Sequence, residues 1–213
     1  MGERKRGPAE APNLGEPAAA RPAASVVLLR RGGKHTDRAL EVLLLKRTEE
    51  AKFMPGVWVF PGGAVDAGDG EDEARFKACA VRELEEEAGI GLAEDEELVL
   101  FSRWITPEVV SRRFDAWFFL ALAPAHTPPA PDGVETTEAR WFTPREALDA
   151  QAAGELVLAF PTIKQLEELL PFGTSEEAIE AYRDREVEPI LPKVIGTPEE
   201  HRVALPGDPD YPA

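Results

Sequence analysis

The sequence predicts a single domain of mixed α+β or sandwich architecture, and three observations support this prediction. Short apolar runs rich in Val and Leu are interleaved with two or three helical segments, at connection lengths typical of compact domains. The chain has 213 residues and is 43% hydrophobic, enough to bury one sizeable core. A single cysteine excludes an internal disulfide, and no apolar run approaches the roughly 18 residues of a membrane helix. We therefore expect one domain.

The charge of the chain limits its partners. A formal net charge of −16 argues against broad binding to nucleic acid or anionic membranes, because both depend on Lys and Arg. A polyanionic substrate would need metal ions or a local basic patch. The N-terminus lacks the apolar centre of a signal peptide, so a cytoplasmic location is expected.

The first half of the chain predicts a tail followed by three strands. Residues 1–22 are rich in Pro, Ala and Gly, have almost no large apolar side chain, and are predicted to be a disordered tail. Residues 24–30 and 40–46 are apolar and predict neighbouring strands. Residues 57–60 predict a short third strand, which Pro61-Gly62-Gly63 should end by stopping pairing and turning the backbone before a loop.

A helix is predicted over residues 71–88, which contain strong helix formers and no Gly or Pro, with Gly89 at the C-cap. The later segments predict a domain over residues 23–188 and a Pro-rich C-terminal extension over residues 189–213. The expected elements are strands at 98–105, 114–122 and 135–142, helices at 144–152 and 160–170, an irregular Pro-rich loop at 123–133, and an extended strap from 189.

The candidate chemistry lies on one face of the first helix. Glu83, Glu86 and Glu87 are three and four residues apart, so their carboxylates share one arc of the helix surface, whereas Glu85 points to solvent. Such hard oxygen ligands suit Mg²⁺ or Mn²⁺. For the bare pattern, the simpler interpretation is a solvated acidic helix face in an acidic protein.

The context of these residues favours a specific family. Gly63 and the stretch from Arg82 to Ile90 resemble the Nudix box, G-x5-E-x7-R-E-U-x-E-E-x-G-U with U aliphatic. The resemblance implies the Nudix fold, a mixed β-sheet sandwiched between α-helices, and a hydrolase that cuts a pyrophosphate bond with Mg²⁺ or Mn²⁺. It also implies that Glu83, Glu86 and Glu87 ligate metal, that Gly63 lets its backbone approach the metal, and that Arg82 orients Glu83 through an ion pair.

One departure concerns the first glutamate of the box. Five more residues separate Gly63 from Arg82 than the family spacing allows. Counting back from Arg82 places the first Glu on Ala74, which cannot ligate a metal, so Asp69, Glu71 or Glu73 is the candidate substitute. Cys79 lies one turn before Glu83, and we interpret it as a small packing residue.

A further carboxylate is expected ahead of a late strand, where many Nudix enzymes recruit another Glu as metal ligand or general base. Glu135 is the candidate and Glu138 its rival, and either could be an ordinary polar strand residue. The general base is therefore open among Glu83, Glu86 and Glu135.

Residues upstream of the box indicate a substrate. The stretch from Leu43 to Gly63 resembles the motif of Nudix coenzyme A diphosphatases, L-L-T-x-R-[SA]-x3-[RK]-x3-G-x3-[FL]-P-G-G. Its departures are Leu and Thr at positions 45 and 48. The resemblance implies substrate-binding roles for Arg47, Lys52, Gly56 and Phe60, and the two cations suit phosphates. Solvated strand-end charge is the simpler interpretation of both.

The expected reaction is hydrolysis of coenzyme A or acyl-coenzyme A to 3′,5′-ADP and 4′-phosphopantetheine or its acylated form. The sequence also resembles the peroxisomal branch of these enzymes around Trp104 to Pro107 and Arg112 to Asp115, so Arg112 and Arg113 are further candidates for phosphate contact. Two alternatives stand beside this function: hydrolysis of ADP-ribose or another nucleoside diphosphate derivative, and a non-catalytic Nudix-fold binding protein. The family resemblance also admits a homodimer.

Overall fold

The computed structural model describes residues 15–31, 40–125, 127–196 and 201–212. The expected disordered tail lies mostly on residues 1–14, outside the described residues. Strand β1 (Arg21–Arg31) begins two residues inside the range expected for the tail. Within the described residues, no helix has the length and apolarity needed to cross a membrane.

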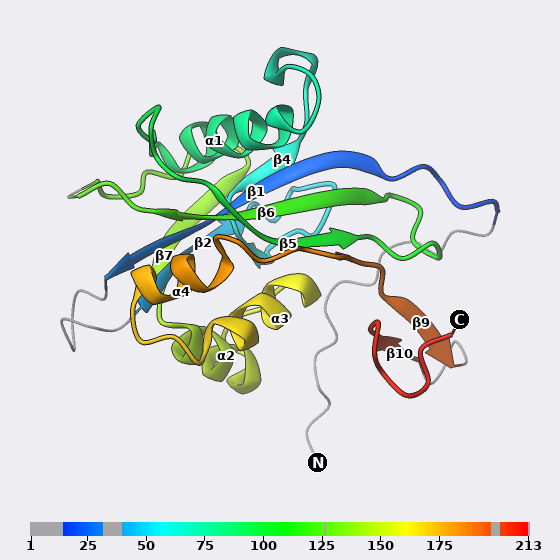
Figure 1. Ribbon diagram of the computed structural model, residues 1–213. Helices are drawn as coiled ribbons and strands as arrows, with labels where there is room; N and C mark the ends of the chain where they lie inside the picture. The colour runs from blue at the N-terminus through cyan, green and yellow to red at the C-terminus, as the bar shows by residue number, and fades with distance from the viewer. Residues whose placement is uncertain (1–14, 32–39, 126, 197–200, 213) are drawn as a thin grey trace.

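Most of the described strands join one mixed sheet of eight strands (Figure 1). The path β3-β2-β1-β6-β5-β8 is extended by β4 on β1 and by β7 on β2. β1 pairs parallel with β6 over nine residues and antiparallel with β2 over three, at the end of β1 and the start of β2. The bounds of these strands are β2 Leu40–Arg47, β3 Trp58–Val59, β4 Gly62–Ala64, β5 Val99–Ile105, β6 Phe114–Leu122, β7 Thr136–Phe142 and β8 Pro189–Ile190.

Two apolar cores cover the two faces of this sheet. Side chains alternate along β1, so that Val27 and Leu29 enter one core while Val26 and Leu28 enter the other. Helix α1 (Ala74–Ala88) packs on one face, and the other face is covered by α2 (Pro144–Ala153), α3 (Phe160–Leu169) and α4 (Ser175–Tyr182) (Figure 1). The fold is the expected α/β/α sandwich.

Helix α1 starts three residues later than predicted. A short 3₁₀ helix, η1 (Ala67–Asp69), precedes it, and Asp72 has a φ of 53°, a left-handed conformation that no α-helix accommodates. The predicted end is confirmed, since Gly89 has a φ of 64° and donates its N–H to the carbonyl of Glu85. The insertion between Gly63 and Arg82 is therefore absorbed by a loop and η1, and the register of the acidic helix face is kept.

The Pro61-Gly62-Gly63 segment was expected to end strand pairing, and this prediction is corrected. Pairing with β2 does stop at β3, but Gly62 and Gly63 then pair with Ser25 and Ala24 of β1. A Cβ atom at Gly62 would lie 2.5 Å from the carbonyl oxygen of Ala24, so only glycine permits this approach. The double glycine thus moves the chain from one strand partner to another.

The C-terminal third contains more regular structure than predicted. The described part of the Pro-rich loop 123–133 is irregular, as expected. Helix α4 was not predicted, although Thr174 and Glu177 form a capping box at its start. An extended strap was expected from residue 189. It is seen only at β8, on the sheet edge, because β9 (Lys193–Gly196) and β10 (His201–Ala204) form a separate two-stranded antiparallel sheet.

Candidate active site

The carboxylates of α1 lie where the helix crosses the β1–β4 pairing. Leu84 and Ala88 are fully buried in the core beneath α1, and this fixes the rotation of the helix. Glu83 is then partly buried beside β4, Glu87 is buried with 3% of its surface exposed, and Glu86 is exposed. Glu85 is exposed on another part of the helix surface, as expected.

Arg82 is the centre of a network of ion pairs. Its guanidinium binds both carboxylate oxygens of Asp69, with Nε 2.8 Å from Oδ1 and Nη2 3.0 Å from Oδ2. Its Nη1 donates to Glu83 and to Glu86, each at 2.9 Å. The ion pair between Arg82 and Glu83 that the family resemblance implies is therefore present, and Arg82 reaches two of the three predicted ligands at once.

Glu87 is held by the glycine turn and by an arginine from β2. It accepts a hydrogen bond of 2.9 Å from the backbone N–H of Gly62, and Arg47 Nη1 lies 4.0 Å from its Oε1. Burial raises the pKa of Glu87 to about 8, and the nearby Glu83 adds to this shift. A buried carboxylate with so little compensating charge is a suitable position for a cation.

Gly63 lies directly against Glu83. A Cβ atom at position 63 would be 2.3 Å from Glu83 Oε1, so any larger residue would push this carboxylate away. Burial raises the pKa of Glu83, and Arg82 opposes the shift. The structure thus places the Gly63 backbone beside the Glu83 carboxylate. The family resemblance implied that this backbone approaches a metal ion.

Glu135 lies at the end of the loop that precedes β7, exposed and close enough to raise the pKa values of Glu83 and Glu87 through its charge. The loop is anchored by Asp132, whose carboxylate accepts the backbone N–H groups of Val134, Glu135 and Thr136 at 2.8–3.1 Å. The hydroxyl of Thr136 also donates to the carbonyl of Glu87 at 2.9 Å. Sequence reasoning missed Asp132; the Asp-Gly pair ahead of a strand was the available signal.

Glu138, the rival of Glu135, is engaged elsewhere. It forms an ion pair of 3.1 Å with Lys46, its cross-strand partner on β2. The structure therefore brings Glu135 to the carboxylates of α1 and pairs Glu138 with a strand lysine.

The three candidates for the missing first glutamate occupy different environments. Asp69 is buried, and its pKa is lowered chiefly by the hydrogen bonds from Arg82. Glu71 and Glu73 are exposed in the turn before α1. Cys79 is fully buried, and burial raises the pKa of its thiol to about 12, in agreement with the predicted packing role.

The residues of the upstream motif divide into two groups. Arg47 is only 18% exposed and reaches the site, and Lys52 is exposed in the loop between β2 and β3. Gly56 has a φ of 69° and Glu49 packed where a Cβ would lie, so it shapes this loop. Phe60 is 2% exposed and packs edge-on against Phe118, which favours a role in the core, and its expected contact with substrate stays a prediction.

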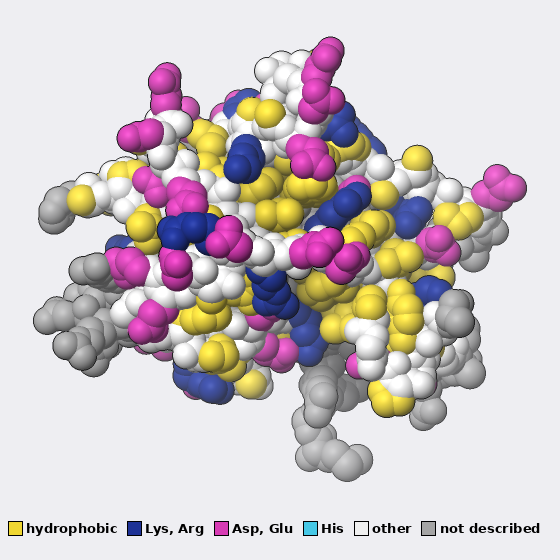
Figure 2. Space-filling model, in the orientation of Figure 1, with side chains coloured by type: hydrophobic (Ala, Val, Ile, Leu, Met, Phe, Trp, Pro, Cys, Tyr) yellow, Lys and Arg dark blue, Asp and Glu magenta, His cyan; other side chains and the backbone are white. Residues whose placement is uncertain are grey.

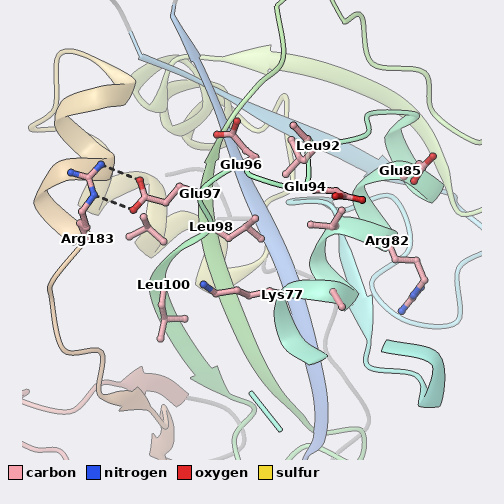
Figure 3. A pocket seen from close by; sticks show the side chains of 14 residues that line it. Lys77, Arg82, Glu85, Leu92, Glu94, Glu96, Glu97, Leu98, Leu100 and Arg183 are labelled. Carbon is pink, nitrogen blue, oxygen red and sulfur yellow. Dashed lines mark hydrogen bonds and ion pairs between the residues drawn. The ribbon is translucent and has the colours of Figure 1, made fainter. Parts of the chain in front are cut away.

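A cavity of about 970 Å³ lies beside this site, between α1 and residues 92–100 (Figure 3). Leu92, Leu98 and Leu100 line it, and hydrophobic side chains are visible between α1 and β5 in Figure 2. Arg82 is among the lining residues, with its side chain directed away from these leucines in Figure 3, but Glu83 and Glu87 are not. The cavity therefore borders the site without including Glu83 or Glu87.

The cluster of Glu83, Glu86 and Glu87 offers the hard oxygen donors that a divalent cation prefers, but these side chains lie beside arginines. Within the described segments, no three His, Cys, Asp or Glu side chains converge as a ready-made metal cluster. Arg82 stands between Glu83 and Glu86, and Arg47 faces Glu87. The oxygen donors, the buried Glu87 and the space kept by Gly63 fit Mg²⁺ or Mn²⁺, provided that Glu86, which is exposed, turns from Arg82 toward the ion.

Comparison with known proteins identifies the family to which this protein belongs. The model of the NUDIX domain matches residues 19–160, well over half of the chain, so the protein belongs to the Nudix family. It is a Nudix hydrolase, an enzyme that acts on pyrophosphate bonds. A solved NUDIX hydrolase from Alicyclobacillus acidocaldarius superposes with a TM-score of 0.68 at 26% identity, over 76% of this chain and 96% of that chain.

Two curated relatives indicate which branch of the family the chain resembles. A Caenorhabditis elegans protein provisionally named nudix hydrolase 7 is 32% identical, covering 88% of this chain and 73% of that protein. Acyl-coenzyme A diphosphatase NUDT19 of Xenopus laevis is 24% identical, covering 81% of this chain and 71% of its own length. The chain thus resembles the coenzyme A diphosphatase branch, as the upstream motif indicated.

Proposed function

We propose that this Nudix hydrolase cleaves the pyrophosphate bond of coenzyme A or acyl-coenzyme A, giving 3′,5′-ADP and 4′-phosphopantetheine or its acylated form. The observation that carries the proposal is the position of Arg47. This residue of the coenzyme A motif lies 4.0 Å from Glu87, so one side chain connects the substrate motif to the catalytic helix.

Each residue of the site has a proposed role in this reaction. Glu83, Glu86, Glu87 and Glu135, with the Gly63 backbone, would hold Mg²⁺ or Mn²⁺. Such ions, when bound, neutralise charge on the phosphoryl oxygens and lower the pKa of water. Arg82 keeps Glu83 oriented, and Arg47 offers a cationic partner to a substrate phosphate.

The bond changes follow from hydrolysis. A water oxygen forms a bond to one phosphorus while the bridging P–O bond breaks, and the bridging oxygen leaves with the other phosphate. The proton of the water passes to a carboxylate among Glu83, Glu86 and Glu135. The buried Glu87, which has hydrogen-bonding and ionic partners of its own, is assigned to ion binding.

Similarity to a named acyl-coenzyme A diphosphatase supports the substrate assignment, and the motif from Leu43 to Gly63 supports it independently of overall identity. The test is hydrolysis of coenzyme A, acetyl-coenzyme A, ADP-ribose and NADH with Mg²⁺ or Mn²⁺, with chromatographic separation of the products. Preferential release of 3′,5′-ADP from coenzyme A is expected. Cleavage of only ADP-ribose or NADH would retain the hydrolase and refute the substrate.

A further inference from the structure

We infer that Phe53 and Arg112 form a second anion site that binds the phosphate on the ribose of the substrate, and so select nucleotides that carry this phosphate. The inference rests on the proposed function and extends it, because it concerns a substrate group remote from the bond that is cut. The chemistry to be recognised is an adenine nucleotide with a phosphate monoester besides the pyrophosphate.

Phe53 is tied to the catalytic helix through Arg47. The Nε of Arg47 donates to the carbonyl oxygen of Phe53 at 3.1 Å, while its Nη1 faces Glu87. One arginine therefore spans the distance from the carboxylate group to the backbone of Phe53. A nucleotide whose pyrophosphate lies at Glu87 and Arg47 would extend along this loop.

The Phe53 ring is held in place and remains partly accessible. It packs edge-on against Phe114 at the start of β6, with 5.4 Å between the ring centroids, and both rings are half-buried. The guanidinium carbon of Arg112 lies 5.9 Å from the Phe53 centroid. An aromatic face beside a cation can stack a base while the cation binds a phosphate on the attached ribose.

Arg113 has a structural role, whereas its neighbour Arg112 is available to a ligand. Arg113 donates to the carbonyls of Thr106 and Ala18, and Phe114 and Thr106 exchange two further hydrogen bonds across the base of the loop. Arg112 itself is exposed at the edge of this pinned loop. The position of its Cα is therefore fixed, whereas its guanidinium can move to a ligand.

Among the described residues, the absence of a carboxylate partner beside Arg112 also favours an anionic ligand at this position. Asp and Glu number 40 against 24 Lys and Arg, so in this acidic chain an anionic ligand is bound best by cations that face no carboxylate. In the parts of the chain that the structure describes, neither Arg112 nor the nearby Lys52 forms an ion pair with a carboxylate. Cations that form no ion pair with a carboxylate, beside a phosphate-cleaving site, complement a substrate with several phosphates.

The test compares coenzyme A with 3′-dephospho-coenzyme A, which differ only in the ribose phosphate. Arg112→Gln should lower the ratio of kcat/KM for these two substrates by about tenfold, the usual effect of one charge-assisted hydrogen bond. Arg112→Lys should retain part of the preference. Arg145→Gln, at an exposed position of α2, is the matched control and should leave the ratio at the wild-type value.

Equilibrium binding gives a second readout that does not depend on turnover. Calorimetry with 3′,5′-ADP and 5′-AMP should show tighter binding of 3′,5′-ADP to wild type, and Arg112→Gln should remove most of that difference. Phe53→Leu should weaken both ligands, because it removes the stacking surface.

The two proposals fail in different ways. If wild type hydrolyses coenzyme A but Arg112→Gln leaves both the substrate ratio and the binding difference unchanged, the second anion site is refuted and the proposed function stands. The second anion site is also refuted if wild type binds 3′,5′-ADP no better than 5′-AMP. If wild type does not hydrolyse coenzyme A at all, the proposed function itself fails.

Discussion

At the scale of residues, Arg82 organises the site by using nearly all of its donors on the surrounding acids. Asp69 takes the guanidinium fork, and Glu83 and Glu86 share the remaining nitrogen. This division explains how the insertion is tolerated. Asp69 reaches the site from the inserted segment, and its role in the structure is to position Arg82.

Asp69→Asn tests this role. Loss of the charged bidentate pair should lower the free energy of unfolding by about 1–2 kcal/mol and should weaken catalysis, because Arg82 would no longer be fixed. Urea denaturation and steady-state kinetics measure the two effects. Glu71→Gln, an exposed acid in the same insertion, should change neither, and equal effects of the two substitutions would contradict the assignment.

Glu87 makes stability depend on pH in a known direction. Its pKa is near 4.5 when unfolded and about 8 in the metal-free fold, so the folded protein binds the proton more tightly. The stabilisation is complete below about pH 4.5 and is lost as the pH rises through 8.

Compared with Glu87→Gln, metal-free wild type should therefore lose stability progressively between pH 5 and 8. Thermal melting in a chelator at several pH values measures the difference, and Mg²⁺ should reduce the loss by favouring the ionised carboxylate. A difference in Tm that stays constant over this range would show that Glu87 is ionised throughout.

At the scale of elements, the site depends on how a loop is fixed to a helix. Asp132 folds the end of the Pro-rich loop around its carboxylate, and Thr136 and Ala130 bind the last carbonyls of α1. Glu135 is thereby placed beside Glu83 and Glu87, although 48 residues separate Glu135 from Glu87 in the sequence.

Asp132→Ala should release this loop. We expect about a tenfold fall in kcat and a higher Mg²⁺ concentration for half-maximal activity, because Glu135 would no longer be held at the site. Kinetics under Mg²⁺ titration measure both quantities. Val134→Ala, on the same loop and 75% exposed, is the control, and a variant of Asp132 with wild-type Mg²⁺ dependence would contradict the positioning role.

Sequence reasoning could predict the elements that local patterns determine. The register of Glu83, Glu86 and Glu87 follows from helical periodicity alone, and Gly89 as a cap follows from its position. The pairing of Gly62 with Ser25 could not be predicted, because it depends on a strand distant in the sequence. The buried environment of Phe60 was missed for the same reason, since its motif position gives no information about depth.

At the scale of the whole molecule, the two helical layers of the sandwich differ in their proposed roles. Both layers bury apolar side chains against the sheet, but only α1 carries Glu83, Glu86 and Glu87. Leu84 in α1 and Leu166 in α3 are both fully buried, one in each core. The two positions therefore test whether the layers act independently.

Leu84→Ala and Leu166→Ala should each lower the free energy of unfolding by about 2–5 kcal/mol, the usual cost of such a cavity. Only Leu84→Ala should also raise the Mg²⁺ requirement, because it allows the adjacent Glu83 to shift. Urea denaturation and Mg²⁺ titration of activity provide the comparison. An equal change in Mg²⁺ requirement for both variants would show that the layers are coupled.

The central claim is that the acidic face of α1 forms a divalent-metal centre that hydrolyses coenzyme A. The most direct measurement compares release of 3′,5′-ADP from coenzyme A in Mg²⁺ by wild type, Glu86→Gln and Glu85→Gln. These two glutamates are adjacent and both exposed, but only Glu86 shares the arc of Glu83. A loss of about a hundredfold or more for Glu86→Gln, with activity retained in Glu85→Gln, is the expected result. Equal activity of both variants would contradict the account.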